Sequence, residues 1–309
     1  MRVALLVFAV FSTLSGLGSG AAAQGLGPNI GGFLYENGHF SRLPVTYGIN
    51  DDGVIFGGFG LQSISGGAVP IIQIPFSGAL NDINDNGEGV GDAYINGIQE
   101  GFVGSASGYT GFSVPGSFRT LATGINDAGV IVGHYVKTQG DFATGYVLSS
   151  GAYKNIVVPG AFSTAPAAIN DSGEIVGAAG IAGQQGFSGF ILKDGVYSTF
   201  QANFFGEKES TAFVGINNLG QILGRTDDGF GFIFDDGVFS LINVPNSMVT
   251  APTGINDSGQ IVGYYTGDGA VPEPSAWILM MVGLGAIGGA MRSKRHLGYG
   301  SMRVAFARR

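Results

Sequence analysis

The stretch TGINDSGQIVG, residues 253–263, sets the architecture of this chain, because five similar stretches precede it. They read YGINDDGVIFG (47–57), NDINDNGEGVG (81–91), TGINDAGVIVG (123–133), AAINDSGEIVG (167–177) and VGINNLGQILG (214–224). Successive copies start 34, 42, 44, 47 and 39 residues apart. A period of about 40 residues is typical of stacked supersecondary units, which bury their apolar faces only against neighbouring units. The sequence therefore predicts a repeat protein.

Each copy predicts a β-hairpin. An apolar step leads into the turn Asn-Asp-x-Gly, and a β-branched run such as Ile175-Val176-Gly177 follows the turn. Asn and Asp side chains bind their own backbone in such turns, and Gly takes the positive φ that closes them.

A second phrase alternates with the first and predicts another hairpin. Its clear copies are GFLYENGHFSRL from Gly32, GYVLSSGAYKNIVVPG from Gly145, GFILKDGVYSTF from Gly189 and GFIFDDGVFSLINVPN from Gly231. Apolar residues alternate on either side of a Gly-containing turn, as in paired antiparallel strands. Two hairpins per period give the four short strands of one β-propeller blade, so we expect an all-β fold.

The two ends of the array predict that it closes on itself. The repeats begin with a lone hairpin of the second type (32–43) and end with a lone hairpin of the first type (254–265). Joined together, they would complete one blade and leave no free sheet edge. The sequence predicts a β-propeller of six four-stranded blades, closed by this split blade. A β-solenoid or another number of blades remains the alternative.

The N-terminal segment predicts export. Residues 1–23 combine an early Arg2, an apolar run over 3–11 and the small residues Ala21-Ala22-Ala23. This is the pattern of a secretory signal peptide with an A-x-A cleavage site, and a retained anchor helix is the alternative.

The C-terminal segment, 271–309, predicts a membrane anchor. Residues 276–291 are uncharged and apolar, and the basic residues Arg292, Lys294 and Arg295 follow. This pattern predicts a short transmembrane helix over 276–291 with a cytoplasmic basic tail, 292–309. The body of the protein then lies outside the inner membrane.

This segment resembles the PEP-CTERM sorting signal of Gram-negative bacteria. The family pattern is a Pro-Glu-Pro motif, a transmembrane helix and a basic end, here Pro272, Glu273 and Pro274 followed by the segments just described. The resemblance implies an exosortase-type processing enzyme as partner, an exopolysaccharide-producing host, and sorting to the cell surface or beyond. The chain departs from the pattern in continuing to Arg309.

The repeats over residues 30–265 resemble the extracellular HAF-repeat family. Its units carry Gly-Ile-Asn-Asp-x-Gly with a Gly-Phe partner, as at Gly254 and Gly231 here. This resemblance implies no known catalysis.

The repeat domain, 24–270, is acidic and contains no cysteine. It holds seven Lys and Arg and 21 of the 22 Asp and Glu, and so carries a net charge of −14. Such a balance excludes nucleic acid as an expected partner, because phosphate contacts need clustered basic residues. The absence of cysteine excludes disulfides and thiolate chemistry.

We expect neither catalytic residues nor a metal site. The chain has only three histidines, His39, His134 and His296, and none of them form a pair with metal-ligand spacing. Calcium bound by the oxygen-rich turns is the alternative for a cofactor, because Ca²⁺ takes six to eight oxygen ligands. The carboxylates concerned are Asp51, Asp85, Asp127, Asp171 and Asp257.

An irregular insertion offers the best candidate for a ligand-binding loop. It places Phe204, Phe205 and Glu207 where other repeats have Val-Pro-Gly. Insertions in repeat proteins tend to decorate the functional face. The two aromatic rings could stack on a sugar or could plug the core beneath the loop.

Three classes of function remain open. The expected one is a noncatalytic surface or matrix protein that binds exopolysaccharide or another envelope component. The second is a carbohydrate-active lyase or hydrolase that uses acidic residues at the propeller centre, since a fold does not name an activity. The third is a self-associating structural coat protein.

Overall fold

The computed structural model describes residues 30–57, 60–67, 69–95 and 97–267, and every regular element in them is a β-strand. They belong to the first of two compact units, 1–271. The predicted signal peptide, the Pro-Glu-Pro motif, the apolar segment and the basic tail lie outside the described residues. Within the described ranges, no helix has the length and apolar character needed to cross a bilayer.

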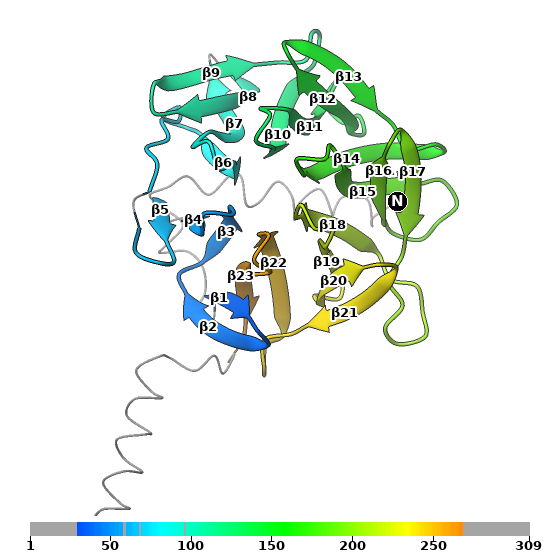
Figure 1. Ribbon diagram of the computed structural model, residues 1–309. Coiled ribbons are helices and arrows are strands. Elements are labelled where there is room, and N and C mark those ends of the chain that lie inside the picture. The colour runs from blue at the N-terminus through cyan, green and yellow to red at the C-terminus, as the bar shows by residue number, and fades with distance from the viewer. Residues whose placement is uncertain (1–29, 58–59, 68, 96, 268–309) are drawn as a thin grey trace, which may run out of the picture. The chain divides into compact units, whose positions relative to one another are not determined.

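The strands form small antiparallel sheets (Figure 1). The two ends of the described chain share one sheet, in the order β2-β1-β23-β22: β1 (Ile30–Glu36), β2 (His39–Leu43), β22 (Val249–Ile255) and β23 (Ile261–Thr266). The next sheet contains β3 (Thr46–Ile49), β4 (Val54–Gly57) and β5 (Gly60–Ser63).

Two further four-stranded groups are joined by a single parallel bridge between Arg119 and Gln99. The first group is β6 (Ala79–Ile83), β7 (Gly89–Ile95), β8 (Ile98–Ser105) and β9 (Gly108–Phe112). The second is β10 (Arg119–Ile125), β11 (Ile131–Val136), β12 (Thr144–Ser149) and β13 (Ala152–Ile156).

The last two sheets each have four strands in chain order. One contains β14 (Ala161–Ile169), β15 (Ile175–Ile181), β16 (Ser188–Lys193) and β17 (Val196–Phe200). The other contains β18 (Thr211–Ile216), β19 (Ile222–Thr226), β20 (Gly231–Asp235) and β21 (Val238–Ile242).

These groups surround a common centre, and one strand of each group lies innermost (Figure 1). The innermost strands are β3, β6, β10, β14, β18 and β22; each contacts the next, and β22 contacts β3. The described residues therefore form a closed, propeller-like ring of sheets. The predicted all-β fold is confirmed.

The ring closes through the two ends of the repeat array, as the sequence predicts. Strand β1 pairs with β23 over six residue pairs, including Phe33 with Gly263 and Leu34 with Val262. The two lone hairpins thus form a single sheet.

One sheet departs from the predicted four strands, because β3, β4 and β5 have no fourth partner among the described residues. The chain after β5 contains Pro70 and Pro75, which cannot donate a ladder hydrogen bond. Instead, the backbone N–H of Gln73 donates a hydrogen bond to the carbonyl oxygen of Ser105 in the next sheet group, at 3.0 Å.

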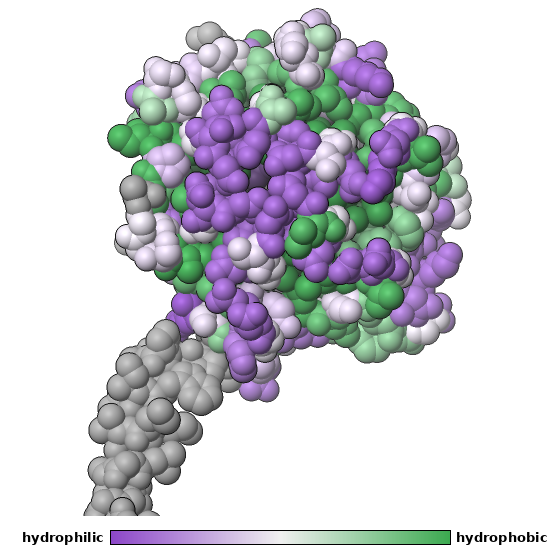
Figure 2. Space-filling model, in the orientation of Figure 1, coloured by the Kyte–Doolittle hydropathy of each residue, from purple (hydrophilic) through white to green (hydrophobic). Residues whose placement is uncertain are grey.

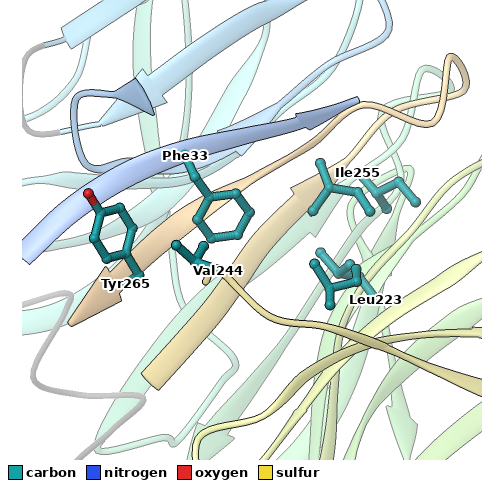
Figure 3. Packing of buried hydrophobic residues seen from close by; sticks show 7 residues of the cluster. Phe33, Leu223, Val244, Ile255 and Tyr265 are labelled. Carbon is teal, nitrogen blue, oxygen red and sulfur yellow. The ribbon is translucent and has the colours of Figure 1, made fainter. Parts of the chain in front are cut away.

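The apolar core lies between neighbouring sheets. Figure 3 shows one such layer, in which Phe33, Ile255 and Tyr265 of the end-sharing sheet pack toward Leu223 of β19 and Val244. All five side chains are buried. Because each interface joins consecutive repeats, no repeat can bury its core alone.

Candidate functional site

The six turns of the repeated phrase, five Asn-Asp and one Asn217-Asn218, meet at one end of the ring, around a central channel. They follow the innermost strands, which lie side by side, and the repeated phrases line a cavity of about 100 Å³. Figure 2 shows hydrophilic side chains gathered around a hollow near the middle of one face. We call the end that carries these turns the turn face.

The asparagines of the turns form a closed circle of hydrogen bonds, which we call the Asn ring. Each Oδ1 accepts the backbone N–H four residues later, at 2.8–3.0 Å. Each Nδ2 donates to the carbonyl oxygen of the next asparagine in the ring, at 3.1–3.3 Å. The members are Asn50, Asn84, Asn126, Asn170, Asn217 and Asn256, all buried. The circle ends where it began, with Asn256 donating to Asn50.

The following residues form a second circle, the Asp ring. In each turn the backbone N–H of this second residue donates to the side-chain Oδ1 of the equivalent residue in the next turn, at 2.6–3.0 Å. The members are Asp51, Asp85, Asp127, Asp171, Asn218 and Asp257. The prediction that both side chains cap their own turn is right for the asparagines and wrong for the acids, because the stacked turns bring each acid within reach of its neighbour.

Burial, and then the crowding of carboxylates at the mouth, raises the pKa of two acids of the Asp ring. Burial, together with the charges of Asp257 and Asp85, raises the pKa of Asp51 to about 6. The pKa of Asp85 is also raised, first by burial and then by Asp127. Like charges held close together favour the protonated form.

The one amide in the Asp ring bridges two of these carboxylates. The Nδ2 of Asn218 donates to Asp171 Oδ2 at 2.9 Å and to Asp51 Oδ2 at 3.4 Å. A carboxylate at this position would replace two attractive contacts by repulsion. The departure of the fifth repeat from Asn-Asp therefore stabilises the mouth of the channel.

Asp82 lines the channel and was not among the candidate residues predicted from the sequence. It takes a position where four of the other five copies have Gly and one has Ala. Its Oδ1 accepts the N–H of Ile83 and its Oδ2 that of Ile125 on the next innermost strand, both at 2.9 Å. Burial raises its pKa to about 7, against the opposing effect of these two hydrogen bonds. The break in the Gly pattern at NDIND was the available signal.

A second polar group joins the same two sheet groups. Asn81 donates to Asp92 Oδ1 at 3.0 Å and to the carbonyl oxygen of Ala122 at 2.8 Å. Gln99 donates to Asp92 Oδ2 at 2.7 Å. Asp92 is buried, and burial raises its pKa. Asn81 and Gln99 satisfy both oxygens of Asp92 within one sheet group. The bond from Asn81 to Ala122 joins this group to the next.

The predicted ligand loop divides its residues between core and surface. Phe204 packs against Phe232 and Phe239, with ring centroids 5.8 and 6.0 Å apart. Phe205 is 67% exposed, and its ring centroid lies 5.1 Å from that of the half-buried Phe230. Glu207 is exposed. Phe204 thus plugs the core, while Phe205 and Glu207 remain available to a ligand.

His39 and His134, the two histidines of the described chain, lie in different sheet groups. Among the described residues, no group of three or more His, Asp and Glu residues is placed to hold a metal ion. Calcium at the five ring aspartates stays a prediction. His39 is exposed at the start of β2, and His134 is buried in β11, where burial lowers its pKa to about 4.

Comparison with known proteins identifies the C-terminal signal. Residues 270–295 match the PEP-CTERM protein-sorting motif. The motif implies export, membrane anchoring, and then sorting to the cell surface, and it is a signal for exosortase processing. It covers Pro272, Glu273 and Pro274 and extends through Arg292, Lys294 and Arg295.

Other comparisons add little. No curated protein matches the chain. A solved structure of a putative TolB from Agrobacterium tumefaciens aligns with 10% identity, over 77% of this chain and 98% of that one, at a TM-score of 0.48. A catalytically inactive virginiamycin B lyase from Staphylococcus aureus, solved with quinupristin, aligns with 8% identity over 78% and 97%, at 0.33. Neither likeness carries an argument about activity.

Proposed function

We propose that this chain is a noncatalytic binding protein of the bacterial surface or extracellular matrix, and that its ligand is exopolysaccharide. The sorting motif supports the location. In this proposal residues 1–23 direct export, residues 276–291 hold the chain in the inner membrane, and the repeats are of the extracellular HAF type.

The observation that carries the noncatalytic role is the use made of the repeated polar residues. All twelve side chains of the Asn and Asp rings bond to a neighbouring turn. They serve to close the ring, which we take to be six blades including the split one. Function is then left to the loops, which vary between repeats.

Phe205 is the first residue to test, because an exposed ring can stack on the apolar face of a sugar. Isothermal titration calorimetry should give saturable binding of exopolysaccharide from the producing organism to the chain cleaved at a protease site inserted after Gly267. We expect Phe205→Ala to weaken binding several-fold, while Val238→Ala, which also truncates an exposed apolar residue, leaves it unchanged. Absence of binding, or equal loss in both variants, would overturn the proposal. A calcium chelator in a parallel titration tests the five aspartates.

A second candidate, a glycan lyase or hydrolase, is favoured by Asp82. A carboxyl group with a pKa near 7 in a cavity suits general acid or base catalysis. The length of the polymer, followed by size-exclusion chromatography during incubation with the protein, separates the two functions. Shortening that is lost in Asp82→Asn would establish the enzyme and exclude the noncatalytic role.

A further inference from the structure

The face opposite the turn face carries a set of exposed apolar side chains. We call it the loop face, because it holds the connections that join each outermost strand to the next innermost strand, and each second strand to the third. Backbone bonds tie these connections together, such as Thr164 N–H to the carbonyl oxygen of Ala143 at 3.0 Å and Thr250 N–H to that of Gly229 at 2.9 Å.

Five of the exposed residues lie in or beside the connections between sheet groups, and Phe142 lies in the connection between β11 and β12. The set consists of Phe76, Phe118, Phe142, Phe162, Phe205 and Met248. Phe142 and Phe162 come from neighbouring sheets and pack ring on ring, with centroids 4.7 Å apart. Phe76 is fully exposed and Met248 is 82% exposed. These side chains have no hydrogen-bonding group. The turn face also exposes apolar residues, such as Leu219 and Val238, but every exposed phenylalanine of the described chain lies on the loop face. Apolar residues gathered on one surface indicate an interaction site.

The described chain both begins and ends on this face. Ile30 at the start of β1 pairs with Thr266 at the end of β23. The backbone N–H of Met248 donates to the carbonyl oxygen of Thr266 at 2.8 Å. The chain that carries the sorting motif therefore leaves the ring beside one of the exposed apolar residues.

The distance from this exit to the membrane is bounded by the sequence. Only residues 268–275 separate the last described residue from the apolar segment that starts at Ala276. Eight residues span at most about 29 Å when fully extended. The loop face is thus held within reach of the bilayer for as long as the sorting segment anchors the protein.

We propose that the loop face rests on the lipid bilayer while the C-terminal segment is retained, with its Phe and Met side chains in the interfacial region. Transfer of apolar side chains out of water is favourable, and a tether raises their effective concentration at the membrane surface. The repeat domain has a net charge of −14, so electrostatic attraction to anionic lipid does not contribute. Without the tether we expect only weak membrane binding.

This inference rests on the proposed membrane anchor over residues 276–291 and adds a change of state to the proposed function. Removal of the anchor would free the loop face, including Phe205, for another ligand. The Asp ring, on the opposite face, would point away from the bilayer throughout.

Labelling at single cysteines can test the orientation, because the chain contains no cysteine of its own. The full chain would be reconstituted into vesicles of phosphatidylethanolamine and phosphatidylglycerol, with a polarity-sensitive fluorophore at Phe118→Cys or Met248→Cys. Leu219→Cys and Val238→Cys are matched controls, because both residues are exposed and apolar and lie at turns of the turn face.

We expect nitroxide groups on the lipid acyl chains to quench the two loop-face labels several-fold more than the two controls. Cleavage of a protease site inserted after Gly267 should abolish this difference. Equal quenching at all four positions, or protection of the loop-face labels by exopolysaccharide but not by lipid, would overturn the proposal. Glycan binding by the cleaved protein is measured separately, so failure of one proposal leaves the other standing.

Discussion

Asn170 shows how a single repeated residue connects two sheets. Its Oδ1 accepts the N–H of Glu174 within its own turn, and its Nδ2 donates to the carbonyl oxygen of Asn217 in the next turn. The same side chain therefore fixes the hairpin and the position of its neighbour. This double role explains why an amide, with one donor and one acceptor group, occupies all six positions.

We expect Asn170→Ala to destabilise the fold markedly, because the half-buried N–H of Glu174 loses its partner and the carbonyl oxygen of Asn217 keeps only the bond from Gly220. A buried polar group left without a partner costs about 1–3 kcal/mol. Urea denaturation followed by circular dichroism would measure the loss. Asn155→Ala is a suitable control, since Asn155 is exposed and makes one longer bond, at 3.3 Å to the hydroxyl of Tyr135. Equal stability of the two variants would contradict a structural role for the Asn ring.

Asn218→Asp should destabilise the protein in a pH-dependent way. The change removes two hydrogen bonds and adds a carboxylate beside Asp51 and Asp171. When the pKa of a carboxyl group is raised in the folded state, the protein loses stability as the pH rises from the unfolded-state pKa to the folded-state pKa. For Asp51 in the unchanged protein this window runs from 3.8 to about 6, mainly because of burial, and a carboxylate at position 218 would raise its upper limit. The deficit in Tm should therefore be small near pH 4 and large at pH 7; a deficit that does not vary with pH would contradict the repulsion argument.

Protonation of the buried His134 should destabilise the folded protein at acidic pH. Burial lowers its folded pKa from 6.5 to about 4, and the charge of Arg119 adds to the effect. The unfolded chain then binds a proton first, so stability is lost as pH falls from 6.5 toward 4. The shift corresponds to about 3 kcal/mol. His134→Leu should flatten this part of a Tm profile; an unchanged acid limb would show that other groups cause it.

At the scale of the element, the close approach of innermost strands depends on small residues. A Cβ at Gly254 would lie 2.9 Å from the Cα of Gly48 and from the backbone nitrogen of Ile49, across the junction where the ring closes. The equivalent Gly215 has more room, because the nearest atoms to its Cβ would be side-chain carbons at 3.6 Å.

These two glycines make a matched pair of variants. Gly254→Ala should lower Tm by several degrees more than Gly215→Ala, because backbone atoms cannot move aside as a side-chain end can. Differential scanning fluorimetry of both proteins would measure it. A similar fall in the two variants would show that the effect arises from loss of glycine and not from crowding at the closure.

The sequence predicts the hairpins well and their mutual contacts poorly. The Gly of every Asn-Asp turn has a positive φ, between 70° and 81°, as the turn pattern requires. Local chemistry determines such features. By contrast, the acids bond to a turn 34 to 47 residues away, or 206 residues away at the closure. Nothing within one repeat indicates that partner, because it depends on how neighbouring hairpins stack.

The candidate site was predictable only in part, for the same reason. Phe204 and Phe205 stand side by side in the sequence, yet one is packed in the core and the other is exposed. Asp82 stands where the other copies have Gly or Ala, so the sequence marks it as unusual. Its raised pKa depends on burial within the assembled ring, which the sequence does not show. Side-chain environment in both cases is set by neighbouring repeats.

At the scale of the whole molecule, the ring has one junction that differs from the others. Five contacts in the Asp ring join turns that are consecutive in sequence, and the sixth joins Asp257 to Asp51. That sixth contact, the bond from Asn256 to Asn50 and the pairing of β1 with β23 together close the array. Closure pairs β1 with β23, whose edges would otherwise be free, and makes the repeats a single rigid support for the loops. The expectation that no free edge remains is wrong, because outer strands such as β2 and β17 have no further partner among the described residues.

Amide hydrogen exchange at the Asp ring tests this closure most directly. The six turns lie at the surface, so their N–H groups would exchange quickly if they were free. We predict that the N–H groups of Asp51, Asp85, Asp127, Asp171, Asn218 and Asp257 are all protected, and to a similar degree. Rapid exchange at Asp257, with protection at the other five, would show that the ring is open where its ends meet, and would contradict the account.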